Sequence, residues 1–249
     1  RILGEALELS PATRGLMSAY PGRVHLLPAA DATLLGLAVG MAFAGERPVV
    51  ELAGPEALPG ALQQLVQEAA GVTGDYRASV VVRVPVPPGR DSGVGSLLGA
   101  VGLRIVAASS PAEAGILLQE ALGVDGPVVI FEPAGAMLGG LADLESLPLG
   151  RARVLREGAD ITLLAWGEGV PAALVAAERL ASDGIEVDVV DLRTLAPLDL
   201  ETIDAVVSRS GRFVLTGAPE AVLSRIIQRT FLRLESPPEA VPAGGDIIQ

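Results

Sequence analysis

Several residue types are absent or scarce in this chain of 249 residues. It has no cysteine, which excludes a disulfide scaffold and thiolate catalysis and is compatible with a reducing, cytoplasmic location. It has one histidine, His25, so a metal site built from several histidines is excluded. Aromatic residues make up 3% of the chain although 50% of its residues are hydrophobic, so the core has to be built from Ala, Val, Leu and Ile.

Positive charge is also scarce. The chain has 18 arginines and no lysines but 30 acidic residues, which gives a formal net charge of -12. Such a surface repels phosphate backbones, which argues against a nucleic-acid partner. The longest uncharged apolar stretch, Ala32–Gly45, falls short of the roughly 18 to 20 residues that span a bilayer, so we expect no membrane partner. The chain begins at Arg1 without an initiator methionine or a signal-peptide pattern, and we expect its true N-terminus to be missing.

The chain alternates short β-branched runs with segments of helical period, which is typical of βαβ units and parallel sheets. In the first half we expect strands at 23–27, 48–52, 79–85, 103–109 and 127–133, and helices near 32–44, 56–71 and 112–122. The pattern restarts with strands at 160–167, 185–193 and 212–218, and with helices at 171–182, at 200–209 and from the last strand to about residue 234. The segment "ESPPEAVPAGG" (Glu235–Gly245) is expected to be a proline-rich tail.

A Gly- and Leu-rich stretch at 134–150 has no clear period and interrupts the alternation. We therefore predict an α/β fold of two stacked three-layer domains with mostly parallel sheets. The predicted ranges are 1–137 for the first domain, 138–150 for a linker and 151–249 for the second domain.

Two features invite a chemical interpretation on their own. His25 lies inside a predicted strand, where a satisfied core or edge histidine is the simpler interpretation. The run "GEGVPA" (Gly167–Ala172) follows a strand and opens a helix, with Asp188 and Asp191 about 20 residues on, which is the form of a dinucleotide-binding turn. The alternative is a tight turn between strand and helix, and Glu168 within the run would repel phosphate.

A more specific pattern lies in the second half. The runs "LPLGRARVLREGADITLLAWG" and "GIEVDVVDLRTLAPLDLETI" are similar, almost residue for residue, to the C-terminal domain of the β subunits of thiamine-diphosphate-dependent 2-oxoacid dehydrogenases of the pyruvate and branched-chain types. The first half continues the resemblance with "LGE" (Leu3–Glu5), "GLAVGMAFAGERPVVEL" (Gly36–Leu52) and "PVVIFEP". The resemblance implies a transketolase-like pyrimidine-binding domain followed by a transketolase C-terminal-like domain.

The resemblance also implies where the cofactor would lie. The family has a glutamate at the head of the helix after "PAA", whose carboxylate contacts the pyrimidine ring nitrogen of thiamine diphosphate, and Asp31 stands at that position. Asp31 is thus the candidate catalytic residue, although it is one methylene shorter and is also a favoured helix cap. The cofactor-binding positions carried over from the family are Glu5, Asp31, Gly54, Glu56 and Ala57.

Other family groups are missing. Gly54 and Ala57 in "AGPEA" stand where the family has aromatic residues that enclose the pyrimidine. The loop "PPGRDSGVGSLLGAVGLRIV" has no histidine for acyl transfer, and "LTGAPEAVLSR" replaces a run that carries a histidine and a glutamate in the family. We therefore favour a catalytically degenerate β-like subunit with a structural or regulatory role.

Two alternatives stay open. One is a working β subunit in which Asp31 activates thiamine diphosphate for oxidative decarboxylation of a 2-oxoacid. The other is a nucleotide-binding module that uses Gly167–Ala172. Because the family holds the diphosphate and magnesium on a G-D-G motif of the α subunit, and this chain has none, the resemblance implies an α-subunit-like partner in an α2β2 assembly. A homodimer without cofactor, and docking on an acyltransferase core, are the further partner expectations.

Overall fold

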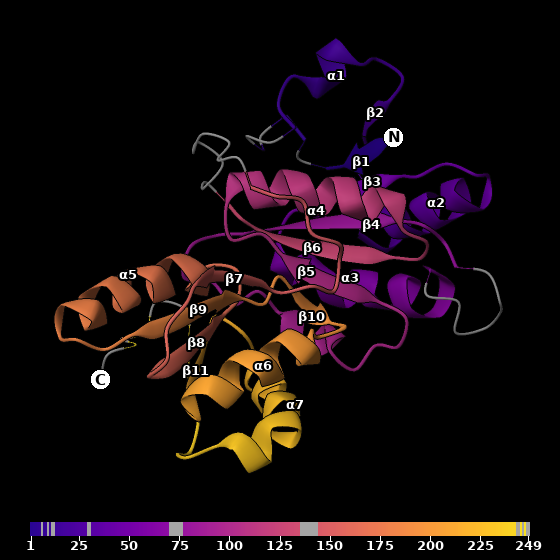
Figure 1. Ribbon diagram of the computed structural model, residues 1–249. Coiled ribbons are helices and arrows are strands. Elements are labelled where there is room, and N and C mark those ends of the chain that lie inside the picture. The colour runs from indigo at the N-terminus through magenta and orange to yellow at the C-terminus, as the bar shows by residue number, and fades with distance from the viewer. Residues whose placement is uncertain are drawn as a thin grey trace. The chain divides into compact units, whose positions relative to one another are not determined.

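The computed structural model describes residues 1–5, 7, 8, 10, 13–28, 31–69, 77–134, 144–242, 245 and 247. The chain divides into two compact units, Arg1–Val106 with Ser110–Leu144, and Ala107–Ser109 with Glu145–Gln249 (Figure 1). Each unit contains a mostly parallel sheet with helices packed on it, which confirms the predicted α/β fold class. Within the described residues, no helix is both long and apolar enough to cross a bilayer.

The sheet of the first unit has the strand order β5-β6-β4-β3-β1-β2. The pairings of β1 with β2 and β3, of β3 with β4, and of β4 with β6 are all parallel. Valines such as Val82 and Val129 are fully buried because both faces of the sheet are covered. The strands are β1 (Ile2–Gly4), β2 (Val24–Leu26), β3 (Val49–Glu51), β4 (Val81–Val86), β5 (Arg104–Ala107) and β6 (Val128–Pro133).

Of the three helices predicted for the first unit, those at 32–44 and 112–122 are confirmed, and the short α1 (Leu16–Ala19) and η3 (Val94–Leu97) were not predicted. The segment expected as a single helix at 56–71 is divided into η1 (Pro55–Ala57), α3 (Leu58–Gln63) and the π-helical η2 (Gln64–Ala69). Pro55 and Pro59 lack an N–H and can only occupy the first turn of a helix, so each of them opens a new element. The remaining helices are α2 (Asp31–Phe43) and α4 (Pro111–Gly123).

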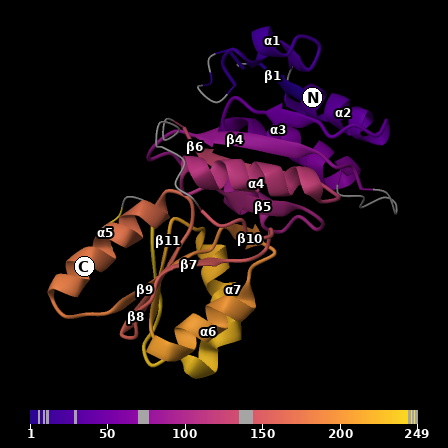
Figure 2. The same ribbon diagram turned by 45° about the horizontal axis from the view of Figure 1, so that its top comes forward.

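The second unit contains a sheet of order β12-β11-β8-β9-β7, in which only β7 is antiparallel to its neighbour. Helix α5 lies on one side of these strands and α6 and α7 on the other (Figure 2). Its strands are β7 (Arg153–Arg156), β8 (Ile161–Ala165), β9 (Val187–Asp191), β11 (Phe213–Thr216) and β12 (Glu239–Val241), with the short β10 at Thr194–Ala196. Its helices are α5 (Gly169–Ser182), α6 (Leu200–Ser210), α7 (Glu220–Thr230) and η4 (Phe231–Arg233).

The proline-rich tail expected at 235–245 is wrong in part, because β12 lies inside it. Val214 of β11 pairs in parallel register with Glu239, and Thr216 pairs with Val241. Of the linker expected at 138–150, residues 138–143 lie outside the described residues, and Glu145 onward belongs to the second unit.

Candidate functional site

Asp31 is the first residue of α2, so its carboxylate lies in the first helical turn. A hydrogen bond from its own backbone N–H acts on this carboxylate and by itself lowers its pKa. A negative charge is favoured there by the positive end of the helix dipole. Helix α3 packs beside α2, and a Cβ added to Gly60 would lie 3.9 Å from Cβ of Asp31.

Asp31 shares its surroundings with Glu5 and Glu56, so the structure brings together all three acids of the predicted site. Partial burial raises the pKa of Asp31, the hydrogen bond from its own N–H lowers it, and the negative charges of Glu5 and Glu56 raise it, for a net shift above the ordinary value of 3.8. A carboxyl group with a raised pKa keeps its proton to higher pH and can then donate a hydrogen bond. Glu5 directly follows β1, and Glu56 comes soon after β3, so both lie at the carboxyl ends of parallel strands.

The segment after β3 has lost the aromatic surface that the family resemblance calls for. Gly54 has extended backbone with φ of 175°, and a Cβ added there would lie 2.6 Å from Oε1 of Glu56. The Glu56 carboxylate is therefore folded over Gly54 and takes the space that a larger side chain would enter. Ala57 is buried and small, so neither position offers a ring to stack on a flat ligand.

A buried charged network lies in the same unit and was not anticipated from the sequence. Arg83 on β4 donates from Nε to Oε1 of Glu132 at 2.9 Å and from Nη2 to Oε2 at 2.5 Å, and its Nη1 also donates to Glu51 on β3. The Thr13 hydroxyl lies 3.1 Å from Oε1 of Glu51 and 2.8 Å from the Leu7 carbonyl oxygen. The network ties the end of β3 to Leu7 and Thr13. In the sequence, the network is indicated by one charged residue within each of three Val-rich runs.

The loop before β5 lies against the start of α3. Gly93 has a φ of +66°, which favours glycine, and a Cβ added there would lie 3.4 Å from Cδ1 of Leu58 and 3.7 Å from the Pro55 carbonyl oxygen. Asp91 shapes the turn by accepting the Gly93 N–H at 3.0 Å. His25 lies on β2, the last strand in the sheet order, and is partly buried, which fits the edge-histidine interpretation.

In the second unit, Gly169 of "GEGVPA" and Gly217 after β11 serve close packing of backbone on backbone, and Gly167 supplies a positive φ of +55°. A Cβ on Gly169 would lie 2.8 Å from the Thr216 carbonyl oxygen, and a Cβ on Gly217 would overlap the Trp166 carbonyl oxygen. Both loops at the carboxyl ends of β8 and β11 thus touch directly, at the place where a doubly wound sheet would otherwise open a crevice.

The two aspartates expected to serve a nucleotide also have structural partners. Asp188 is fully buried, and its Oδ1 accepts from the Gly158 N–H at 3.0 Å and from Nη2 of Arg209 at 2.5 Å. Asp191 accepts from the Ser109 hydroxyl at 2.6 Å and from the Arg193 N–H at 2.8 Å. These contacts favour the tight-turn interpretation.

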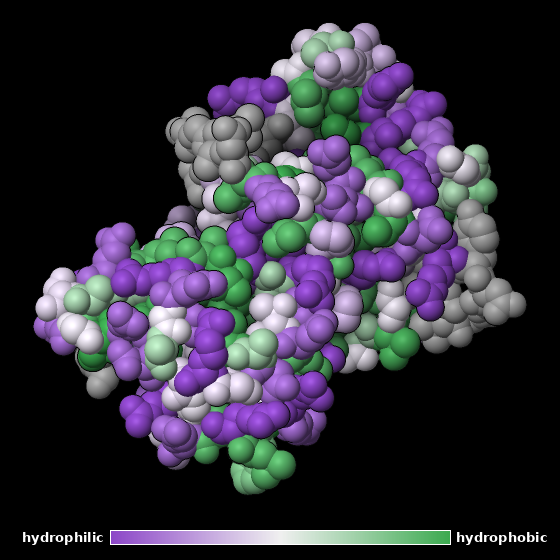
Figure 3. All heavy atoms as spheres, viewed as in Figure 1, coloured by the Kyte–Doolittle hydropathy of each residue, from purple (hydrophilic) through white to green (hydrophobic). Residues whose placement is uncertain are grey.

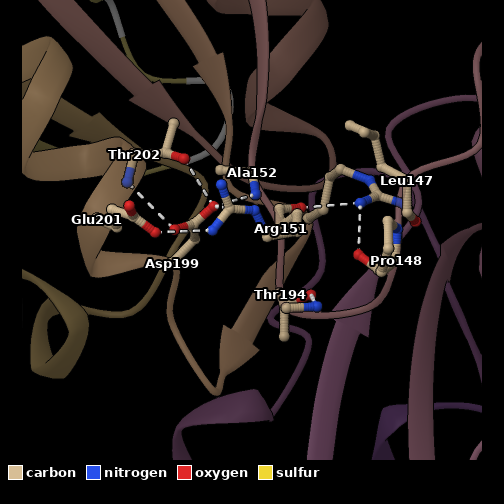
Figure 4. A network of polar contacts seen from close by, with 10 residues as sticks. Leu147, Pro148, Arg151, Ala152, Thr194, Asp199, Glu201 and Thr202 are labelled. Atoms are coloured by element: carbon tan, nitrogen blue, oxygen red, sulfur yellow. Dashed lines mark hydrogen bonds and ion pairs between the residues drawn. The ribbon is translucent and has the colours of Figure 1, made fainter.

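Arg193 holds the start of the second unit in place. Its side chain is fully buried, its φ is +51°, and its guanidinium donates to the carbonyl oxygens of Leu147 at 3.0 Å, Pro148 at 3.3 Å and Arg151 at 2.8 Å. Figure 4 shows Leu147, Pro148 and Arg151 gathered in this network. The "DLRTLAPLD" run therefore has a structural role.

Asp199 belongs to the same run and caps α6. Its Oδ1 accepts the Thr202 N–H at 3.1 Å, and its Oδ2 accepts the Thr202 hydroxyl at 2.7 Å and the Ala152 N–H at 3.0 Å (Figure 4). Burial raises the pKa of Asp199, but these hydrogen bonds and the nearby Arg151 guanidinium outweigh burial and lower it.

An open cavity of about 390 Å³ lies in the first unit at the end of α2 opposite Asp31. Its lining includes Ala42, Gly45, Arg47, Arg77, Ser79 and Asp125. Arg47 donates to the Leu122 and Val124 carbonyl oxygens at the end of α4, so its charge is already engaged. This cavity is separate from the acids around Asp31.

Comparison with known proteins places this geometry in a family. Residues 150–243 match the family described as transketolase, C-terminal domain. Over 247 residues the chain is 36% identical to the pyruvate dehydrogenase E1 component subunit beta of Leifsonia xyli subsp. xyli, covering 90% of this chain and 73% of the relative. Over 220 residues it is 37% identical to the 2-oxoisovalerate dehydrogenase subunit beta of Bacillus subtilis, covering 82% of this chain and 67% of the relative.

A solved structure shows the fold as well. It is described as a split gene transketolase, inactive beta4 tetramer, and matches with a TM-score of 0.80 at 22% sequence identity, covering 97% of this chain and 81% of that one.

Proposed function

The chain belongs to the β subunits of 2-oxoacid dehydrogenase E1 components, and from this membership we propose that it is a catalytically degenerate β-like subunit with a structural or regulatory role. The observation that carries the proposal is the Glu56 carboxylate folded over Gly54, where the family resemblance calls for an aromatic ring. A charged group in that space replaces a stacking surface, so a flat pyrimidine ring loses its apolar contacts.

The residues present fit thiamine diphosphate only in part. When bound, this cofactor supplies the carbanion chemistry of 2-oxoacid decarboxylation. Asp31 fits the pyrimidine contact, because it places a carboxyl at the head of α2, where the family resemblance has its glutamate. Gly54 and Ala57 do not fit the enclosure. Within the described ranges, no group of three or more His, Asp or Glu residues could hold a metal ion, so the diphosphate and its metal would depend on a partner chain.

The outer face of α2 suits such a partner. Leu37 and Phe43 are 46% and 54% exposed, and the helix carries no charge after Asp31. Gly40, one turn after Leu37, is exposed with open space around it and would allow a second helix to approach closely. We assign this face to an α-subunit-like chain in an α2β2 assembly, with a homodimer as the form without that chain, and with an acyltransferase core as a further partner of the assembly.

The test is reconstitution with the α chain from the same source, followed by assays of 2-oxoacid oxidation and of lipoyl acylation. We expect a stable complex with no turnover above background, and no gain from Asp31→Glu. Turnover that Asp31→Ala abolishes would overturn the proposal. Thermal unfolding of each variant, measured alongside, separates a lost activity from a lost fold.

The raised pKa of Asp31 favours a second candidate, a working β subunit that supplies this carboxyl to the cofactor. It predicts the opposite pattern, in which Asp31→Glu preserves or raises turnover because the longer side chain reaches further. Asp31→Ala would then cost at least about a hundredfold in rate, the scale expected when a positioned acid is removed.

A further inference from the structure

The stretch from Arg209 to Arg233 differs in charge from the rest of the chain. It contains five arginines and one glutamate, in a protein whose formal net charge is -12. Most of this positive charge lies on or beside α7 and η4, in the second unit. Since the remainder of the chain is strongly acidic, the net charge changes sign locally in this stretch.

Helix α7 presents these arginines on one face. Val222, Ile226 and Thr230 are buried against the unit. The side of α7 opposite these buried residues is exposed, and it carries Ala221, Ser224, Arg225, Gln228 and Arg229. The one acidic side chain of α7, the exposed Glu220, lies at its first residue, so the exposed arginines occupy the later turns of the helix.

Two large apolar residues continue this face beyond the end of α7. Phe231 is 67% exposed and Leu232 is 92% exposed, both in η4, followed by the exposed Arg233. Figure 3 shows hydrophobic side chains standing out among hydrophilic ones at this end of α7. We call Arg225, Arg229, Phe231, Leu232 and Arg233 the basic-apolar tip.

Some of the arginines of the basic-apolar tip have no acidic partner within the described residues. Arg229 lies 3.4 Å from Oδ2 of Asp204, an ion pair with α6. Among the residues that the structure describes, Arg225 and Arg233 have no ion pair, whereas Arg209 and Arg212 are paired with Asp188 and Glu235. Two guanidinium groups and two exposed apolar side chains are therefore available to a partner.

We propose that the basic-apolar tip is a docking surface for a short acidic segment of a partner protein, with an apolar side chain that covers Phe231 and Leu232. The two free guanidinium groups would bind carboxylates of that segment. The proposal does not depend on the chemistry of Asp31. The docking surface can therefore be refuted while the proposed function stands, and the proposed function can be refuted while the docking surface stands.

Charge complementarity favours a short segment over an extended anionic surface. Arg225 to Arg233 spans only about 12 Å of helix, which matches two or three turns of a bound segment. A membrane or a nucleic acid would bring many negative charges near the acidic remainder of the chain, where repulsion opposes binding. A short segment contacts only the basic-apolar tip and does not approach the acidic remainder of the chain.

The experiment uses fluorescence anisotropy with the full chain. The probe is a fluorescein-labelled helical peptide of about 14 residues, four turns, made of Glu, Leu and Ala with leucines on one face. Its twin carries Gln in place of Glu. We expect the acidic peptide to bind more tightly than its twin and to weaken when salt is raised from about 0.05 M to 0.5 M.

Variants of the tip test the assignment. Arg225→Glu with Arg233→Glu should weaken binding by about tenfold or more, and Leu232→Ser by about tenfold, the scale of one buried leucine. Val175 and Arg179 on α5 give a matched control, because they are an exposed apolar residue and an exposed arginine in the same unit. Val175→Ser and Arg179→Glu should change binding less than about twofold.

Equal binding of the acidic peptide and its Gln twin would overturn the proposal. So would an equal loss of binding in the α5 control variants, and binding to phosphatidylserine vesicles without binding to the peptide. Self-association that Arg225→Glu abolishes would assign the tip to a second copy of this chain and would also overturn it.

Discussion

Partial burial and the negative charges of Glu5 and Glu56 act on the Asp31 carboxyl, so its contribution to stability depends on pH. Its pKa is raised in the folded chain, so the folded state binds the proton more tightly than the unfolded state does. The resulting stabilisation is complete at low pH and is lost as the pH rises through the raised pKa. We expect Asp31→Asn to be more stable than the wild type at pH 7, by less than about 1 kcal/mol because solvent screens a partly exposed group.

Urea unfolding at a series of pH values measures this difference, which should vanish below about pH 4, the range of an ordinary aspartate. Carbon NMR titration of the Asp31 carboxyl provides the control. Glu56→Gln should lower the pKa of Asp31, and Glu178→Gln on α5 should leave it unchanged. A wild type that gains stability on Asp31 ionisation would contradict the assignment.

At the scale of elements, the start of α6 depends on one side chain. Asp199 accepts the Thr202 N–H and also ties in the Ala152 N–H, and its pKa is lowered in the folded chain. Asp199→Ala should therefore destabilise the second unit at pH 7 by about 1 to 2 kcal/mol, as the loss of a helix cap does. Chemical unfolding followed by circular dichroism measures this change.

Asp199→Asn separates the cap from the charge, because asparagine is also a good cap. It should cost less than Asp199→Ala. Since the pKa of Asp199 is lowered, the stability from its charge is present above the ordinary aspartate range and is lost as the pH falls through the folded value. Wild type and Asp199→Asn should thus converge at acidic pH. Equal losses for Asn and Ala at pH 7 would mean that the cap contributes nothing.

At the scale of the whole molecule, the proposed function predicts a second chain on the outer face of α2. Native mass spectrometry of the complex purified from the chain's own source would report partner, stoichiometry and bound small molecules together. We expect equal numbers of α-like and β-like chains without a full complement of thiamine diphosphate. A complex saturated with cofactor and magnesium would support the working-subunit candidate instead.

Sequence reasoning predicted the long elements well, because hydrophobic period is a local property. Helices α2, α4 and α5 and the Val-rich strands lie close to their expected ranges. The short strands β1, β7, β10 and β12 were not predicted. Three or four residues carry too little periodicity, and their identity as strands depends on the neighbours they pair with.

The sequence by itself determined the fold class and the family, and through the family resemblance it proposed Glu5, Asp31 and Glu56 as site residues. These follow from local patterns and motifs that are read in order along the chain. Only the tertiary structure decided that the charges of Glu5 and Glu56 act on Asp31, that Glu56 covers Gly54, and that Arg83 joins Glu51 to Glu132. Such contacts join residues far apart in the chain, and their energies depend on burial and distance, which no linear pattern encodes.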